Sequence, residues 1–328
     1  MSFLGNLTIA IPIWRRPNLL DATLNSIFKQ NKICNVLLID DSVSNINSSV
    51  IKKYKILSKK KNINFSVIYN KKNIGIDENI KKCINSVKTK YIWLLGEDDL
   101  LINGSLNMLD KISLKNNYPY YFINYIYSNG NFTNTARHPV IKNKGIYEDT
   151  FCNFSLNNLP YIGFIGSCII NKEKLVIENL DKYIKSYYSH VGLIIDSSIN
   201  HKILIISDVL VLNRAEDINT FTWSKSVFDV YHSFFHVLEN SSLKNCGDNK
   251  YKLTKKNAYN FFKIHKLSWL AAKRGDGIYN FSIYRKYYSA LPFYKKYLAL
   301  LIAFFPVSIL FVLRKIQLFL KFYRKNIY

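Results

Sequence analysis

The stretch Tyr91-Ile-Trp-Leu-Leu-Gly-Glu-Asp-Asp-Leu-Leu101 joins a run of large apolar side chains to three consecutive carboxylates. Such a run is typical of a buried strand that carries polar side chains to the edge of a sheet. Glu97, Asp98 and Asp99 would repel one another unless a cation lay between them, and oxygen ligands suit Mg²⁺ or Mn²⁺. A plainer interpretation is that these acids only precede the next helix, for which Ser105 is a suitable first residue.

The first hundred residues alternate between short apolar runs and amphipathic segments. Because the runs are apolar on both faces, they predict an α/β fold with a parallel sheet covered on both sides by helices. Strands are predicted at residues 7–13, 35–42, 65–69 and 91–95, and helices at 17–30, at 47–59 and after the polar loop 70–79.

A polar cluster follows each of the four predicted strands. The carboxyl ends of parallel strands meet at one edge of a sheet, and ligands bind there. We therefore expect the four clusters to lie close together, although loops are polar in any protein and the pattern alone does not prove a site. The clusters are Pro12 to Arg16, Asp40 with Asp41, Asn73 to Asn79, and Glu97 to Asp99.

The rest of the chain is less regular. Further strands are predicted at residues 120–127, 166–171, 202–206 and 209–212, and a helix at 187–198. From Ser226 onward, aromatic and aliphatic residues recur at helical spacing. We therefore expect a sheet domain over residues 1–220 and a helical region over residues 221–328.

The last fifty residues are basic. Residues 277–328 contain nine Lys and Arg and no acid, and within them residues 297–313 form an uncharged run that Pro306 divides. A membrane-spanning helix needs roughly 20 apolar residues. We expect the segment at about residues 292–325 to lie at the membrane interface, with its basic residues against anionic headgroups. A buried core helix and a full span are the alternatives.

Composition limits the classes of protein. The 328 residues are 48% hydrophobic, which suits a folded protein, and the net charge of +24 implies an anionic partner without identifying it. The five cysteines are scattered and odd in number, so they predict neither a zinc site nor a disulfide framework. The N-terminus shows no secretory pattern, and we expect a cytoplasmic location.

Four motifs resemble, in order and spacing, the family 2 glycosyltransferases with the GT-A fold, and most closely their abequosyltransferase-like branch of O-antigen and capsule enzymes. They are Leu7-Thr-Ile-Ala-Ile-Pro-Ile13, Leu37-Leu-Ile-Asp-Asp-Ser42, Asn73-Ile-Gly-Ile-Asp-Glu-Asn79 and Trp93-Leu-Leu-Gly-Glu-Asp-Asp99. The resemblance extends over about residues 7–110. It implies a Rossmann-like, mostly parallel sheet that binds a nucleotide sugar.

The resemblance also implies roles for single residues. Asp41 or Asp40 would bind the base, and Asp99 would be the principal metal ligand. Glu97 stands where the family usually has the first Asp of its metal-binding motif, so it would be the second ligand. The remaining donor-site residues would be Pro12, Ile13, Arg16, Asn73, Gly75, Asp77, Asn79 and Asp98.

Transfer to a hydroxyl needs a base that removes its proton. The Glu-Asp pair that the family usually carries for this purpose has no clear match, and the corresponding place reads Tyr188-Ser-His-Val-Gly192. His190, with an ordinary pKa near ~6.5, is therefore the first candidate, with a purely structural role as the alternative. Asp149 and Asp196 are weaker candidates.

Together these expectations predict an inverting, Mn²⁺- or Mg²⁺-dependent glycosyltransferase. It would add one sugar to a lipid-linked glycan of an O-antigen, lipopolysaccharide or capsule, on the inner face of the bacterial cytoplasmic membrane. One alternative is a sugar-phosphate nucleotidyltransferase, against which the absence of glycine from residues 12–18 counts. The other is a non-enzymatic membrane- or nucleic-acid-binding protein; no nucleic-acid-binding module is recognisable, so we expect no nucleic-acid partner.

Overall fold

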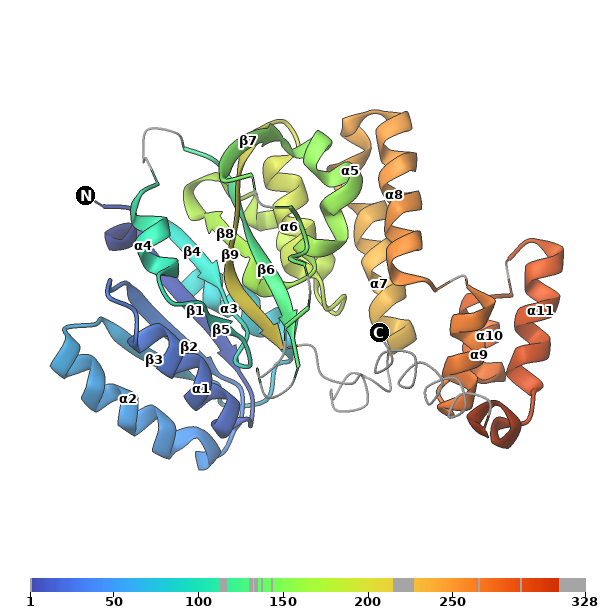
Figure 1. The fold of residues 1–328 in the computed structure, drawn as a ribbon, viewed down its shortest axis with the longest axis horizontal. Helices are drawn as coiled ribbons and strands as arrows, with labels where there is room; N and C mark the ends of the chain where they lie inside the picture. Colours follow the sequence, from blue (N-terminus) through green and yellow to red (C-terminus); the bar gives the residue numbers. More distant parts are fainter. Residues whose placement is uncertain are drawn as a thin grey trace, which may run out of the picture. The chain divides into compact units, whose positions relative to one another are not determined.

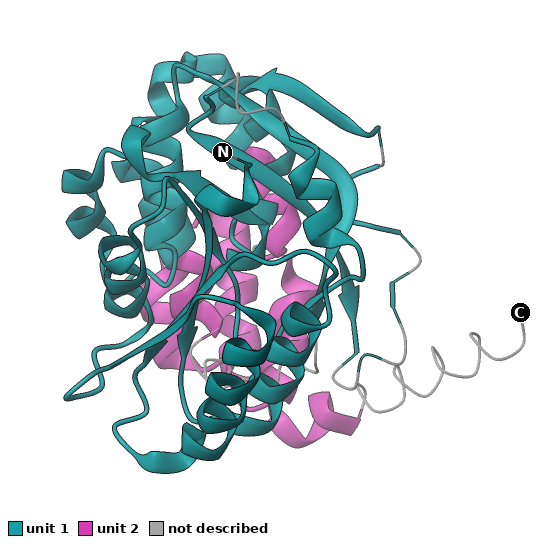
Figure 2. Ribbon diagram, turned by 90° about the vertical axis from the view of Figure 1, so that its left-hand side faces the viewer, with its two compact units in different colours: residues 1–221, 233–255 teal, residues 222–232, 256–328 magenta. Residues whose placement is uncertain are grey.

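The computed structural model describes residues 2–312, apart from 113–116, 130–131, 133–134, 137, 143, 215–226, 265 and 290. The chain divides into two compact units. The first comprises residues 1–221 and 233–255, and the second comprises 222–232 and 256–328 (Figure 2). The predicted boundary at residue 220 lies outside the described residues, and helix α7 (Val227–Asn240) contributes to both units.

The N-terminal part of the first unit follows the predicted alternation (Figure 1). The predicted elements are present. Their observed ends differ from the predicted ones by no more than two residues, except that the third helix begins at Ile76, inside the predicted polar loop 70–79. Pro17 begins the first helix, and Asn62 ends the second in a left-handed conformation with φ 55°. The elements are β1 (Leu7–Ile13), α1 (Pro17–Phe28), β2 (Asn35–Asp40), α2 (Ser48–Lys61), β3 (Phe65–Tyr69), α3 (Ile76–Ser86) and β4 (Tyr91–Leu94).

In the described part of the chain, nine strands form one mixed sheet, in the order β3-β2-β1-β4-β8-β6-β9-β5 with β7 paired to β9. Strands β3, β2, β1 and β4 are parallel, so their carboxyl ends meet at one edge. Strand β8 (Cys168–Asn171) then runs antiparallel to β4. The α/β, Rossmann-like GT-A architecture expected from the motifs is confirmed.

The second half of this unit departs from the prediction in two places. Strand β9 (Lys202–Arg214) is one long strand rather than two, since Ser207 and Asp208 interrupt only its apolar pattern. Strand β7 (Ile146–Thr150) and helix α5 (Phe151–Ile162) were not predicted, because β7 has no apolar run and α5 contains Pro160. The other elements are β5 (Leu100–Leu101), α4 (Ser105–Asp110), β6 (Tyr120–Ser128) and α6 (Ser189–Ser198).

Short 3₁₀ segments connect these elements. They are Leu4–Asn6, Asn45–Asn47, Ile165–Ser167, Lys172–Lys174, Ile177–Tyr183 and Ser242–Cys246. Trp93 is fully buried in the sheet, and its indole N–H donates a 2.9 Å hydrogen bond to the carbonyl oxygen of Gly166. That bond satisfies the one polar group of this large side chain.

Helices complete the described chain. Helix α8 (Asp248–Phe262) spans both units, whereas α9 (Leu267–Gly275), α10 (Phe281–Tyr287) and α11 (Phe293–Phe304) belong to the second. Helix α11 ends just before Pro306, as Pro306 had suggested. Within the described residues, no helix has both the length and the apolar character needed to cross a membrane. The predicted interface segment at about 292–325 lies partly outside the described residues, which end at Val312.

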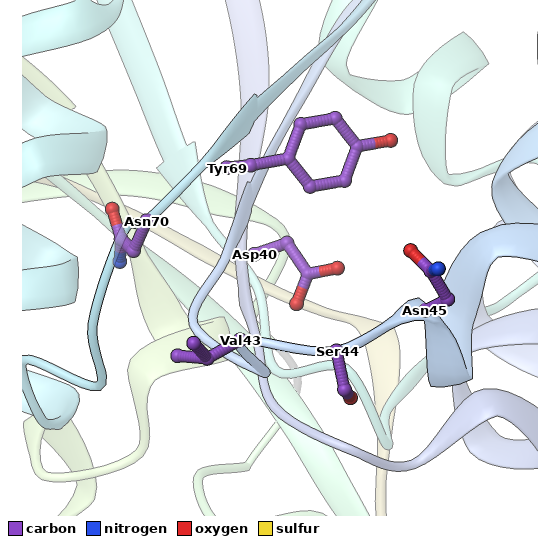
Figure 3. A pocket seen from close by; sticks show the side chains of 6 residues that line it. All are labelled: Asp40, Val43, Ser44, Asn45, Tyr69 and Asn70. Atoms are coloured by element: carbon purple, nitrogen blue, oxygen red, sulfur yellow. The ribbon is translucent and has the colours of Figure 1, made fainter.

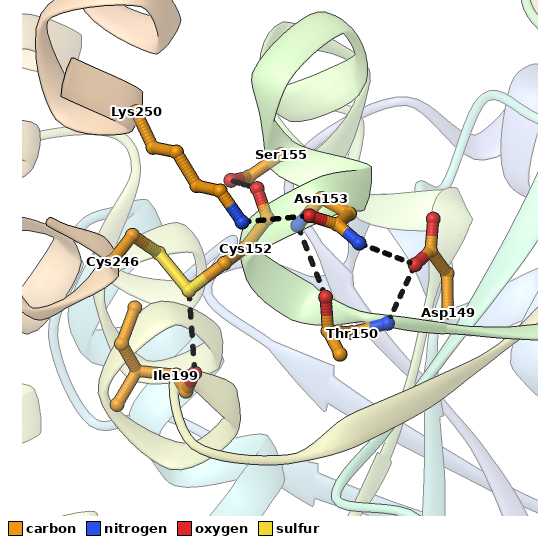
Figure 4. Close-up of a disulfide and its surroundings, with 8 residues drawn as sticks. All are labelled: Asp149, Thr150, Cys152, Asn153, Ser155, Ile199, Cys246 and Lys250. Carbon is orange, nitrogen blue, oxygen red and sulfur yellow. Dashed lines mark hydrogen bonds between the residues drawn. A yellow bond between two sulfur atoms is a disulfide. The ribbon is translucent and has the colours of Figure 1, made fainter.

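A disulfide joins Cys152, in α5, to Cys246, 94 residues away (Figure 4). The scattered cysteines had indicated no disulfide framework, and this single bond was not predicted from the sequence. Such a separation leaves no local spacing signal, because only the fold brings these two residues together. The remaining cysteines, Cys34, Cys83 and Cys168, are free and buried.

Candidate active site

Hydrogen bonds tie together the loops that follow β1, β2 and β4. The backbone N–H of Trp14 donates to Oε2 of Glu97 at 2.7 Å. The backbone N–H of Arg15 donates to Oγ of Ser42 at 2.9 Å. Three of the four predicted polar clusters are thus joined at the carboxyl edge of the sheet.

Asp41 fixes the fourth cluster. Its carboxylate accepts hydrogen bonds from the backbone N–H groups of Ile74 and Gly75 at 2.9 and 3.0 Å and from Nδ2 of Asn70 at 2.9 Å. Gly75 has a φ of 81°, which favours glycine over residues with a side chain. Oδ1 of Asn73 accepts a further bond from Gly75 within the same loop. Asp41 therefore positions the loop and has its oxygens engaged by protein groups.

Asp40, rather than Asp41, borders a cavity of about 430 Å³ (Figure 3). Its Oδ1 accepts a hydrogen bond from the backbone N–H of Ser42 at 2.9 Å, which fixes the carboxylate. The ring of Tyr69 is half exposed, and its pKa is raised by partial burial and by the charge of Asp40. An acid beside an accessible aromatic ring suits a planar, polar ligand. The lining residues are Asp40, Val43, Ser44, Asn45, Tyr69 and Asn70.

Asp98 lies between two guanidinium groups. Its Oδ2 is 2.8 Å from Nη1 of Arg16 and 2.9 Å from Nη2 of Arg214. The side chain of Arg214 is only 5% exposed, and it stands at the end of β9. The two arginines offset the repulsion that the sequence alone suggested for the three consecutive acids.

Glu97 and Asp99, on either side of Asp98 in the sequence, are more deeply buried than Asp98. Oδ1 of Asp99 accepts bonds from the backbone N–H of Arg214 at 3.1 Å and from Nδ2 of Asn213 at 3.2 Å. Burial and the charge of Asp98 raise the pKa of Asp99 well above its ordinary value. Burial also raises the pKa of Glu97 to about 8, although the bond from Trp14 and the charge of Arg16 oppose this.

Asp98 and Asp99 are the residues that could hold a divalent cation, beside Gly96. A Cβ at this glycine would clash with Oδ2 of Asp99 and lie 3.0 Å from Oδ1 of Asp98, so both oxygens border the space that the missing side chain leaves. No described residue donates a hydrogen bond to either oxygen. Across the described residues, no three His, Cys, Asp or Glu side chains converge as ligands. Two carboxylates completed by substrate phosphates and water are typical of Mg²⁺ sites.

Glu97 is held in a different position from these two acids. Its Oε2 accepts the backbone bond from Trp14, and its Oε1 faces Arg16, 3.7 Å from Nε. Both oxygens of Glu97 thus face protein groups of the first loop, whereas Asp98 and Asp99 each have one oxygen directed toward Gly96.

Asp77 and Asn79 connect the site to the rest of the unit. Asp77 accepts bonds from the backbone N–H groups of Tyr187 at 2.9 Å and Ser189 at 3.1 Å, which ties the start of α3 to the start of α6. Asn79 donates to the carbonyl oxygen of Ile39 at 3.2 Å. Asp77 and Asn79 thus hold neighbouring segments in place at the carboxyl edge of the sheet. Pro12 and Ile13, also predicted as donor-site residues, are buried in β1.

His190 does not have the geometry of a base. It is 3% exposed, and neither ring nitrogen makes a hydrogen bond of ordinary geometry. Burial lowers its pKa to about 4, although the charge of Asp77 and the nearby backbone of Ile162 and Gly163 oppose this. A base must reach the proton that it removes, which a fully packed ring cannot do in this conformation. Its role as a packed, neutral side chain is the interpretation that the structure favours.

Asp149 lies at the end of the sheet opposite to the carboxyl edge that carries the other candidate site residues. It pairs with Ile203 near the start of β9, eleven residues from Arg214, or on the order of 30 Å along a strand. Its carboxylate accepts bonds from Thr150 and Asn153 at the start of α5 (Figure 4). Asp196 is engaged by Tyr183, Asn179 and Ser242 in a structural network.

Three residues at the edge were not predicted from the sequence. Arg214 and Asn213 follow an apolar run, as the predicted acids do, but the predicted strand ended at Leu212. Tyr69 was assigned to a strand, without regard to its position as the last residue before a polar loop. In each case the signal was the same as for the acids: a polar or aromatic side chain at the carboxyl end of a strand.

The sequence model of the family described as "Glycosyl transferase family 2" matches residues 8–178. The match covers just over half of the chain, and the chain belongs to this family. It is a glycosyltransferase. No curated protein sequence matches the chain.

Solved structures share the fold. The chain superposes on TarS of S. aureus in complex with UDP-GlcNAc with a TM-score of 0.56 and 14% identity, over 89% of this chain and 83% of TarS 1-349. It superposes on the mannosyltransferase of Pyrobaculum calidifontis in complex with GDP-Man and Mn²⁺ with a TM-score of 0.53 and 11% identity, over 93% and 82% of the two chains. At these identities the likeness concerns the fold alone.

Family membership decides between the classes left open by the sequence. The sugar-phosphate nucleotidyltransferase and the non-enzymatic binding protein are both set aside. The likeness to the abequosyltransferase-like branch stays a prediction, as do the roles of the single site residues.

Proposed function

We propose that this glycosyltransferase moves one sugar from a nucleotide-diphosphate sugar to a hydroxyl of a lipid-linked glycan, with inversion at the anomeric carbon. The observation that carries the proposal is the arrangement at the carboxyl edge of β1, β2 and β4. There the cavity at Asp40, at the end of β2, and the acids Asp98 and Asp99, after β4, lie on either side of β1. One extended ligand with an aromatic ring at one end and a diphosphate at the other suits this arrangement.

In this proposal the base and ribose occupy the cavity beside Asp40 and Tyr69. Val43, Ser44, Asn45 and Asn70 complete the lining of this cavity. Asp41 holds the loop from Asn73 to Asn79 in place through its bonds to Ile74 and Gly75. The complexes of TarS with UDP-GlcNAc and of the mannosyltransferase with GDP-Man support a nucleotide-sugar donor for this chain.

The diphosphate would lie near Asp98, Asp99 and Arg16. A divalent cation held by Asp98 and Asp99 would neutralise negative charge on the leaving diphosphate. Arg16 and Arg214 would add fixed positive charge at the same place, where it is most effective in the transition state. The Mn²⁺ in the mannosyltransferase complex supports the use of a divalent metal, Mn²⁺ or Mg²⁺.

The acceptor is proposed to be a glycan of an O-antigen, a lipopolysaccharide or a capsule, carried on a lipid. This enzyme would then work as a peripheral protein on the cytoplasmic face of the inner membrane. The high net charge of +24 supports an anionic surface as partner.

The donor site is tested by thermal shift and calorimetry with UDP, GDP, CDP and dTDP, each with and without Mn²⁺. We expect one nucleotide to stabilise the wild type, and Mn²⁺ to increase that effect. Asp98→Asn and Asp99→Asn should remove the effect of Mn²⁺, whereas Asp40→Asn and Tyr69→Ala should weaken nucleotide binding about tenfold or more even without metal.

Matched controls carry the same chemical changes at other places. Glu173→Gln removes a carboxylate from an exposed ion pair with Lys90, and Tyr294→Ala removes an exposed ring in α11. Neither should change nucleotide binding. If no nucleotide stabilised the wild type, or if Asp99→Asn and Glu173→Gln behaved alike with Mn²⁺, the proposed donor site would be wrong.

A further inference from the structure

Helix α11 buries two alanines, with Leu300 and Ile302 partly buried beside them, and exposes most of its other large side chains. Ala299 and Ala303 are buried against the rest of the second unit. Phe293, Tyr297, Leu301 and Phe304 recur every three or four residues on the opposite face and are 75%, 50%, 63% and 63% exposed. This is the reverse of the usual pattern, in which the large apolar side chains of an amphipathic helix face the core. We call these four residues the apolar stripe.

The apolar stripe continues beyond α11. The ring of Phe281, in α10, lies 5.1 Å from that of Phe304, and Phe281 is itself 42% exposed. Contiguous exposed apolar surface of this kind is rare in proteins that stay monomeric in water, and it marks an interaction site. Further exposed apolar residues nearby are Tyr294, Leu298, Phe305, Ile309, Phe311 and Val312.

A basic hollow borders the stripe. A cavity of about 400 Å³ is lined by Phe281, Ser282, Arg285 and Lys286, so Phe281 belongs both to the hollow and to the edge of the apolar surface. Arg285 and Lys286 are both exposed, and Lys286 forms an ion pair with Asp229. Lys296 adds an exposed positive charge on α11, and residues 277–312 contain no acid. A hydroxyl and a guanidinium beside aromatic rings suit a phosphate whose ester carries an apolar chain.

We propose that the apolar stripe and the basic hollow together dock the second unit on an anionic phospholipid bilayer. The large side chains enter the boundary between headgroups and acyl chains, and Arg285 and Lys296 meet lipid phosphates. The proposal deepens the proposed function, on which it rests, by naming the surface at which the lipid-linked acceptor is reached.

Charge decides between a bilayer and a second copy of this chain. Two copies joined through the stripe would bring Arg285, Lys295 and Lys296 of each toward the same groups of the other, with no acid in residues 277–312 to pair them. An anionic bilayer supplies both the apolar layer and the opposite charge. The length of α11, twelve residues, suits a helix that lies in the interface rather than one that spans it.

The test is sedimentation of the full chain with vesicles of phosphatidylcholine alone and with 30% phosphatidylglycerol, without nucleotide. We expect binding to the anionic vesicles that weakens with salt. Leu301→Gln with Phe304→Gln should lower the partition coefficient at least tenfold at every salt concentration. Arg285→Gln with Lys296→Gln should lower it about tenfold at low salt and flatten the salt dependence.

The controls make equal changes elsewhere on the surface. Ile56→Gln with Leu253→Gln replaces two exposed apolar residues, and Lys52→Gln with Lys60→Gln removes two exposed charges of α2. Both should bind vesicles as the wild type does. All variants should keep the unfolding temperature of the wild type, because every changed side chain is exposed.

Two results would overturn the proposal. One is equal binding by the stripe variant and its control. The other is a stripe variant that loses self-association in light scattering but keeps its vesicle binding, which would make the stripe an interface between copies. Nucleotide binding is measured separately and without lipid, so a failure of the donor site and a failure of this surface are distinguishable.

Discussion

Arg214 and Asp98 form an ion pair across the carboxyl edge of the sheet, 116 residues apart in the sequence. Nη2 of Arg214 lies 2.9 Å from Oδ2 of Asp98, and the backbone N–H of Arg214 donates to Oδ1 of Asp99 at 3.1 Å. One residue at the end of β9 thus orients both acids that border Gly96. Arg16, from the opposite loop, shares the same oxygen of Asp98.

Replacement of Arg214 by Met should therefore weaken catalysis more than folding. Arg16 still pairs with Asp98, so the acid is not left unpaired, but its direction is no longer fixed from β9. We expect kcat/KM to fall about 10- to 100-fold, or roughly 1.4–2.8 kcal/mol of transition-state stabilisation, with partial recovery in Arg214→Lys. Steady-state transfer assays measure this, with Lys90→Met as a control that breaks an exposed pair with Glu173. Unchanged kinetics would deny Arg214 any role in orienting Asp98.

Gly96→Ala should weaken the proposed cation site of Asp98 and Asp99, because the added methyl group occupies the space beside these carboxylates. The added Cβ would clash with Oδ2 of Asp99, so this carboxylate must turn away from the space that it shares with Asp98. We expect Mn²⁺ binding, followed by calorimetry in the presence of the stabilising nucleotide, to weaken at least tenfold. Gly104→Ala is the matched control for a glycine near the edge: its Cβ would meet nothing within 4 Å, although its φ of 86° carries a backbone cost. Equal metal binding by the wild type and by Gly96→Ala would show that the cation does not bind beside Gly96.

The N-terminal fold was predictable because its signals are local. Strands β1, β2 and β4 are mostly apolar, buried runs that end in polar residues, β3 is a shorter run interrupted by Ser66, and each helix between them has its own apolar face. The parallel order then places the polar ends together without further information. For that reason the edge could be located from the sequence, including Asp40, Asp98 and Asp99.

The parts that were missed depend on contacts between distant segments. Arg214 reaches Asp98 only because β9 pairs with β6 in one particular register. Nothing in the spacing of Asp40 and Asp41 indicates which of them faces the cavity, since Asp41 turns toward Ile74 and Gly75 of another loop. His190 stands at a helix start, as a catalytic base could, and only its packing reveals that both ring nitrogens are buried.

The Cys152–Cys246 disulfide should contribute measurably to stability. It closes a loop of 94 residues, for which the chain-entropy model gives an upper value of roughly 4–5 kcal/mol. We expect Cys152→Ser with Cys246→Ser to lower the free energy of unfolding by about 2–4 kcal/mol in urea titrations of the first unit's transition. A reducing agent should produce the same loss in the wild type and none in the double variant. Stability that is equal before and after reduction would show that the bond adds nothing.

Because the ring of His190 is buried, we expect the free energy of unfolding to depend on pH. Burial lowers its pKa to about 4, whereas an unfolded histidine has a pKa near ~6.5. The native state therefore keeps the ring neutral while the unfolded state binds a proton as the pH falls. The stabilisation is present in full above pH ~6.5 and is lost as the pH falls toward 4, by about 3 kcal/mol in total.

His190→Leu removes that dependence and also tests the role predicted from the sequence. Because the ring nitrogens make no hydrogen bond of ordinary geometry, the apolar replacement should cost less than ~1.5 kcal/mol at pH 8. At pH 5 the proton that the unfolded wild type gains lowers the stability of the wild type by about 2 kcal/mol, so the variant should there be about 0.5–2 kcal/mol more stable than the wild type. His236→Gln, at an exposed histidine, is the matched control and should keep the pH dependence that comes from His190. Transferase activity at neutral pH should stay within tenfold of the wild type. A loss of a thousandfold or more, with the folded state intact, would instead restore His190 as the base and require a conformation in which its ring becomes accessible.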